Sequence, residues 1–192
     1  MSDSLNQFFG FLCGQNPDHT WAPGGILLPV CQRCTGLYVG AAVAALLHWW
    51  LKPRLTPRFL WAHGVFLALM APCGFHWVPQ GPALRTISGL LFGFGVTAFL
   101  KAPLVKSEIR NPKSETNSKS QSAVTYYTGL TITLLLVPLL AARGGWLAAA
   151  LFSGAAFFGA VALAIMILAD TGIALAGLRE RVRCRADAGA GP

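Results

Sequence analysis

Apolar residues occupy five long runs of this 192-residue chain, and short polar segments separate the runs. The runs cover residues 35–51, 58–72, 84–101, 124–142 and 146–169. A helix needs about 20 apolar residues to cross the hydrocarbon core of a bilayer, and the second run is the shortest for this purpose. No run alternates polar and apolar residues as the strands of a membrane barrel do. The pattern therefore predicts an all-α, polytopic bundle of about five transmembrane helices.

The composition supports a place in the lipid bilayer. Hydrophobic residues make up 54% of the chain and charged residues 11%, whereas soluble domains carry about 25% charged residues. The net charge is +8, but the basic residues lie in the connections between apolar runs and not on a polar face interleaved with aromatic residues. We therefore expect the bilayer as a partner and no nucleic acid. A homo-oligomer, a membrane partner and a small-molecule substrate stay open.

The basic residues lie on alternate connections, and this predicts the orientation of the chain. They follow the first, third and fifth apolar runs: Lys52, Arg54, Arg58, Lys101, Lys106, Arg110, Lys113, Lys119, Arg179, Arg181, Arg183 and Arg185. Lys and Arg are enriched in cytoplasmic loops of membrane proteins. We therefore expect the N-terminus outside, the C-terminus in the cytoplasm, and a multi-pass location in a bacterial inner (cytoplasmic) membrane.

Changes of composition along the chain predict five segments. They are an outer Cys-containing segment (1–34), a three-helix half (35–101), a flexible cytoplasmic linker (102–123), a two-helix half (124–178) and a basic, disordered tail (179–192). The linker is predicted because Ser, Asn, Lys and Glu replace apolar residues there.

Four cysteines and two histidines fall on the predicted outer side of the membrane. They are Cys13, Cys31, Cys34, Cys73, His19 and His76. Cys31 and Cys34 form a Cys-x-x-Cys knuckle, which presents two thiolates to one metal ion, and the other residues are candidates for the remaining ligands. A mixed set of sulfur and nitrogen ligands favours zinc, with another transition metal as the alternative.

Other interpretations of the same residues stay open. Four thiols in an oxidising compartment also form one or two structural disulfides. Alternatively, Cys31 and Cys34 exchange disulfides with a substrate, because Arg33 and the start of the following helix lower the pKa of a thiol. A small transporter is a further alternative. Whether the protein is an enzyme is therefore left open.

The residues around these cysteines resemble a known family. Residues 29–36, which read Pro-Val-Cys-Gln-Arg-Cys-Thr-Gly, are similar to the Pro-x-Cys-x-Arg-Cys-Thr-Gly signature of DUF2085, a family of small multi-pass bacterial membrane proteins of unassigned activity. Residues 13–15 resemble its Cys-His-Gln stretch, with Gly14 in place of His, and residues 85–93 resemble its second helix start. The resemblance covers roughly residues 13–95 and implies a fold and a location, but no activity. If the family's His is a metal ligand, His19 or Cys73 must replace it here.

Small residues predict where two helices touch. Gly-x-x-x-Gly pairs begin the first and third predicted helices at matched depth: Gly36 with Gly40, and Gly89 with Gly93. Such pairs allow a close approach of membrane helices, so we expect these helices to meet near the cysteines. His48 and His63 lie near the cytoplasmic ends of the first two runs, and we interpret them as residues of the membrane interface and not as a proton relay.

Overall fold

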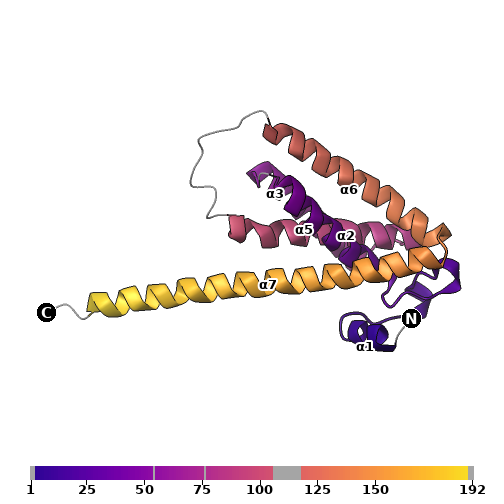
Figure 1. The fold of residues 1–192 in the computed structure, drawn as a ribbon, viewed down its shortest axis with the longest axis horizontal. Coiled ribbons are helices and arrows are strands. Elements are labelled where there is room, and N and C mark those ends of the chain that lie inside the picture. Colours follow the sequence, from indigo (N-terminus) through magenta and orange to yellow (C-terminus); the bar gives the residue numbers. More distant parts are fainter. Residues whose placement is uncertain (1–2, 54, 76, 106–117, 190–192) are drawn as a thin grey trace.

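The protein folds as a bundle of helices, shown in Figure 1. The structure, a computed structural model, describes residues 3–53, 55–75, 77–105 and 118–189. The helices of this part of the chain are α1 (Asp3–Gly10), η1 (Pro17–His19), η2 (Pro23–Gly25), α2 (Gln32–Leu51), α3 (Pro57–Ala68), α4 (Met70–Gly74), α5 (Pro82–Val105), α6 (Ser118–Arg143) and α7 (Trp146–Gly189). Helix α2 contacts α5, α6 and α7 and so lies at the centre. The predicted all-α bundle is confirmed.

The second predicted span is divided into two helices. Four helices of the described chain are long and apolar enough to cross a membrane, namely α2, α5, α6 and α7. Residues 58–72 do not form one continuous helix, because α3 ends at Ala68 and α4 begins at Met70. Pro72 gives the physical reason, since a proline ring clashes with the carbonyl four residues earlier, here that of Ala68, and removes an N–H donor. The number of membrane crossings stays a prediction.

Helices α2 and α5 run in the same direction, so the chain must return between them. The start of α2 lies against the start of α5, because Gly36 approaches the Thr86 backbone, and Gly40, one turn later, approaches Leu90. Helices α3 and α4 make the return. At its end the carbonyl of Cys73 accepts a hydrogen bond from Arg33, at the start of α2. This path is the one that five crossings require.

Four glycines bring the backbones of α2 and α5 into contact. They are Gly36 and Gly40 in α2, and Gly89 and Gly93 in α5. A Cβ atom added at any of them would overlap backbone atoms of the facing helix; at Gly89 it would meet the carbonyl oxygen of Arg33. The predicted close approach is confirmed. Lipid tails are as apolar as the side chains of a membrane helix, so the hydrophobic effect does not drive such helices together. Close packing of this kind is therefore a main source of helix association in membranes.

Two histidines lie inside the bundle and not at the membrane interface. His63 is fully buried and His48 is 7% exposed. A carbonyl only accepts, so His63 Nδ1 donates to the Phe59 carbonyl (2.8 Å), and its neutral Nε2 accepts from the Tyr126 hydroxyl (3.2 Å). Tyr126 Oη in turn accepts from His48 Nε2 (3.5 Å). The interface interpretation was wrong, because Tyr126, far along the chain in α6, supplies polar partners that the local sequence does not show.

Helix α7 extends past the rest of the bundle, as Figure 1 shows. It continues to Gly189, through the part of the chain where the sequence predicted a disordered tail from residue 179. Residues 179–189 include four arginines and two alanines, and both residue types are strong helix formers. Most of the predicted linker, residues 106–117, lies outside the described residues.

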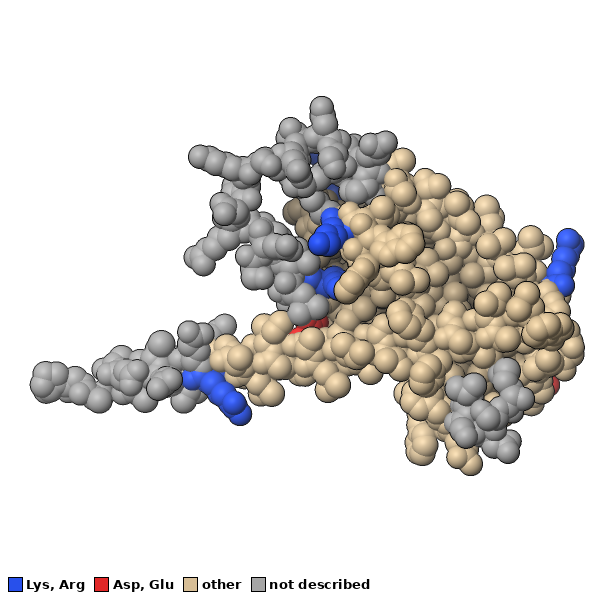
Figure 2. All heavy atoms as spheres, in the orientation of Figure 1, with Lys and Arg blue, Asp and Glu red and all other residues tan. Residues whose placement is uncertain are grey.

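Basic side chains gather at the end of the bundle from which α7 projects, and few lie at the opposite end, as Figure 2 shows. Lys52 directly follows α2, Lys101 lies in the last turns of α5, and Arg58 lies at the start of α3. The wide middle of the face in view carries almost no charge. This distribution agrees with the predicted pattern of basic connections, and the orientation that follows from it stays a prediction.

The glycine contact predicts a strong effect of a single methyl group. We expect Gly89→Ala to lower the free energy of unfolding by about 1–3 kcal/mol, because the methyl group meets backbone that cannot yield. The matched control is Gly154→Ala in α7, where an added Cβ meets nothing within 4 Å and alanine favours the helix by up to about 1 kcal/mol. Thermal unfolding in mild detergent measures both. Equal unfolding temperatures for the two variants would contradict the contact.

Candidate metal site at the start of α2

The segment between α1 and α2 is held against the bundle at the start of α2. Trp21 Nε1 donates to Thr86 Oγ1 of α5 at 2.8 Å. Gly24 packs on the turn between α6 and α7, where an added Cβ would lie 2.8 Å from the backbone nitrogen of Trp146. Its φ of 63° is left-handed, which also favours glycine. The segment is therefore fixed by contacts from three helices.

Helix geometry brings Cys31 and Cys34 together. Cys31 is the N-cap of α2, with φ −65° and ψ 163°, and Cys34 is the third residue of the helix. Side chains at these two positions approach each other, as they do in a capping box. The Thr35 N–H donates to the Cys31 carbonyl at 2.8 Å and closes the first turn. The first turn of α2 carries no acidic residue, so no carboxylate offsets the positive end of the helix beside the two cysteines.

Cys13 reaches the same place from the end of α1. Its N–H donates to the Phe9 carbonyl at 2.8 Å, and the chain then turns at Gln15, whose φ is 43°. Gln15 Nε2 donates to the carbonyl of Asn6 at 2.8 Å and to that of Pro29 at 2.9 Å. This amide ties α1 to the residues just before Cys31. Gln15 belongs to the stretch that resembles the Cys-His-Gln motif of the family, but its role depends on contacts with Asn6 and Pro29 that the motif does not show.

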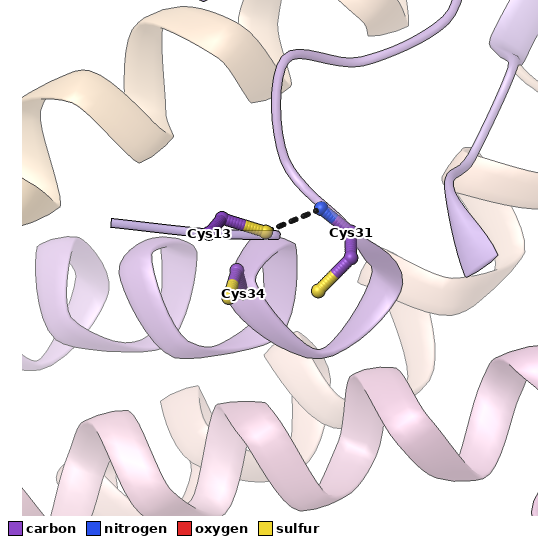
Figure 3. Close-up of side chains that lie close together, drawn as sticks. All are labelled: Cys13, Cys31 and Cys34. Carbon is purple, nitrogen blue, oxygen red and sulfur yellow. Dashed lines mark hydrogen bonds between the residues drawn. The ribbon is translucent and has the colours of Figure 1, made fainter. Parts of the chain in front are cut away.

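The three thiols form one group, shown in Figure 3. The Sγ atoms of Cys13, Cys31 and Cys34 all lie within 4.8 Å of one another, and all three cysteines are free. The Cys31 N–H also donates to Cys13 Sγ at 3.3 Å. Cys13 is 8% exposed, and Cys31 and Cys34 are half-buried. Three cysteines that are spread over 22 residues of the sequence thus meet at the start of one helix.

The other predicted site residues lie elsewhere or outside the description. Cys73 and His19 are not part of the thiol group; His19 is exposed on η1, and the Cys73 carbonyl accepts hydrogen bonds from Arg33 and Gln80. Arg33 Nη2 donates to that carbonyl at 2.8 Å and to Gln80 Oε1 at 3.1 Å. The guanidinium therefore binds the connection between α4 and α5 to the start of α2. His76 lies outside the described residues.

The neighbouring thiols stabilise negative charge on Cys13. Hydrogen bonds from the Cys31 and then the Cys34 side chains lower the pKa of the Cys13 thiol, and backbone N–H groups of Cys31 and Gln15 add to this effect. Burial acts in the opposite direction but is the weaker influence. Cys13 is therefore the thiol of this group that most readily forms a thiolate, which is the form that binds metals.

The spacing of the sulfur atoms fits a single metal ion. Thiolates at about 2.3 Å from one zinc-sized ion lie about 4 Å from each other. The three Sγ atoms are already within 4.8 Å of one another. A disulfide, by contrast, requires two sulfur atoms about 2.0 Å apart and leaves the third thiol of the group unused.

The lowered pKa gives a prediction about acid conditions. In the reduced, metal-free protein we expect thiolate ultraviolet absorbance to persist below pH about 7, where ordinary thiols with a pKa near 8.5 are protonated. It is lost only as the pH falls through the lowered pKa of Cys13. Replacement by serine in Cys13→Ser should remove this absorbance. Identical titrations of the two proteins below pH about 7 would contradict the assignment.

Comparison with known proteins places the same region in one family. The pattern of DUF2085, described as a predicted membrane protein, matches residues 13–99, so α6 and α7 lie beyond the match. An uncharacterized protein of Methanothermobacter thermautotrophicus is 37% identical over 102 residues, which cover 48% of this chain and 87% of the relative. No solved structure matches the chain. The chain is a member of the DUF2085 family of predicted membrane proteins.

Proposed function

We propose that this membrane protein binds one transition-metal ion through the thiolates of Cys13, Cys31 and Cys34. The observation that supports the proposal is the convergence of three free thiols within 4.8 Å. Two of them are placed by the first turn of α2, and the third by the turn after α1. The ion cross-links these two segments, so binding stabilises the fold of the segment before α2 as well as occupying the site.

The structure favours this function over the two-disulfide interpretation. Two bridges need four partners, and Cys73 lies outside the thiol group. Thiol–disulfide exchange needs only Cys31 and Cys34 and does not explain why the Cys13 Sγ is held beside both. The third thiol is therefore the observation that favours a metal site over these two alternatives.

The proposed setting is a cytoplasmic membrane crossed five times, with the metal site at the outer surface. The division of α3 from α4 shortens the second crossing, but together they lead from the basic end of the bundle back to the start of α2. The site then lies opposite the basic end, on the side that the distribution of Lys and Arg predicts to be external. All three thiols belong to the outer segment, residues 1–34, which packs on the half formed by residues 35–101.

Metal content tests the proposal directly. The full chain, reduced and purified in mild detergent, should retain about one zinc or other soft transition-metal ion per chain after desalting. Cys13→Ser, Cys31→Ser and Cys34→Ser should each lower the retained metal by at least about tenfold.

The matched control is Cys73→Ser, which removes a cysteine outside the thiol group and should leave the stoichiometry unchanged. Alkylation followed by intact-mass analysis supplies the second measurement: the three thiols should become reactive on addition of a chelator alone. Thiols that react only after a reductant is added, in a protein without metal, would refute the proposal.

Gln15 is predicted to act as a positioning residue for the site. Gln15→Ala removes the amide that links the carbonyls of Asn6 and Pro29, and should weaken metal binding about tenfold or more without removing a ligand. Gln7→Ala, an exposed position on α1, is the control. Competition with a coloured chelator measures both affinities. Equal affinities for the two variants would show that Gln15 does not position Cys13.

A further inference from the structure

We propose that the ion is monovalent copper, held by three sulfur atoms and by no nitrogen or oxygen atom. This inference rests on the proposed metal site and goes beyond it by naming the ion. It replaces the preference for zinc that a mixed set of Cys and His ligands gives, because His19 is not part of the thiol group.

The ligand type is the first argument. The group of possible ligands at the start of α2 contains Cys13, Cys31 and Cys34, and His19 is not part of it. Thiolates select monovalent copper as well as zinc, whereas imidazole nitrogen suits zinc and divalent copper. A purely sulfur site therefore admits monovalent copper, and the number of sulfur atoms decides between the two ions.

The coordination number is the second argument. Zinc keeps a fourth ligand, either a protein side chain or a water molecule, whereas monovalent copper is stable with three thiolates. The thiols lie against an apolar cluster that includes Phe9 and Val30, which are 0% and 1% exposed. A water ligand on this side would find few polar partners, so a fourth ligand would have to approach from the open side, beside the half-buried Cys31 and Cys34. Tyr38 also borders the thiols, but its neutral phenol is a poor ligand for a soft ion.

Charge is the third argument. Three thiolates leave a monovalent ion with a more negative site than a divalent ion would have. The start of α2 is suited to this charge, because its positive end has no acidic residue in the first turn and the Cys31 N–H already donates to Cys13 Sγ.

Direct competition between the two ions tests the inference. The reduced full chain in mild detergent is offered equimolar monovalent copper and Zn²⁺ without oxygen, desalted, and analysed for both elements. We expect about one copper per chain, no displacement by a roughly hundredfold excess of Zn²⁺, and a first shell of three sulfur atoms in copper X-ray absorption. Cys73→Ser, His76→Ala and Tyr38→Phe should keep the copper affinity within about twofold.

The outcomes separate this inference from the proposed function. Retention of zinc in place of copper, a nitrogen or oxygen atom in the first shell, or loss of copper affinity in His76→Ala would overturn the copper assignment and leave a metal site. Failure to retain either ion would overturn both. Because the comparison uses the unaltered chain, it does not depend on whether a cysteine variant folds.

Discussion

The contact between the backbones of α2 and α5 is the constraint on which the rest of the structure depends. Gly36, Gly40, Gly89 and Gly93 leave no room for a Cβ atom between the two helices. Their contact fixes the depth and rotation of α2. Because Cys31 and Cys34 belong to the first turn of that helix, the same contact decides where two of the three thiols point. It also makes α2 and α5 parallel, which forces α3 and α4 to lead the chain back between them.

The third thiol depends on a different kind of interaction. Cys13 lies in a segment with little regular structure, so its position follows from individual hydrogen bonds: the two made by Gln15, that of Trp21 with Thr86, and that of the Cys31 N–H with the sulfur itself. A packed helix pair thus supplies a rigid half of the site and a hydrogen-bonded segment supplies the other. An ion that binds all three sulfur atoms joins the two halves, which is why ligand binding and local stability are expected to be coupled.

Much of the fold could be predicted from the sequence because membrane helices are specified by local composition. The apolar runs predicted the bundle, and the Gly-x-x-x-Gly pairs predicted the α2–α5 contact. Pro72 was sufficient to predict the helix break after Ala68. The site could be predicted only in part. The Cys-x-x-Cys spacing brings Cys31 and Cys34 together at any helix start. The residues around Cys73 and His19, by contrast, do not indicate that these two side chains lie outside the thiol group. The burial of His48 and His63 likewise depends on Tyr126 in a distant helix.

The central claim is that Cys13, Cys31 and Cys34 bind the same ion. An experimental structure of the metal-loaded protein, with anomalous scattering recorded at the absorption edge of the bound element, tests it most directly. We expect a single anomalous peak about 2.3 Å from all three sulfur atoms. A sulfur–sulfur bond between two of the three cysteines, with the third thiol free and no peak beside it, would show that the three thiols do not bind one ion.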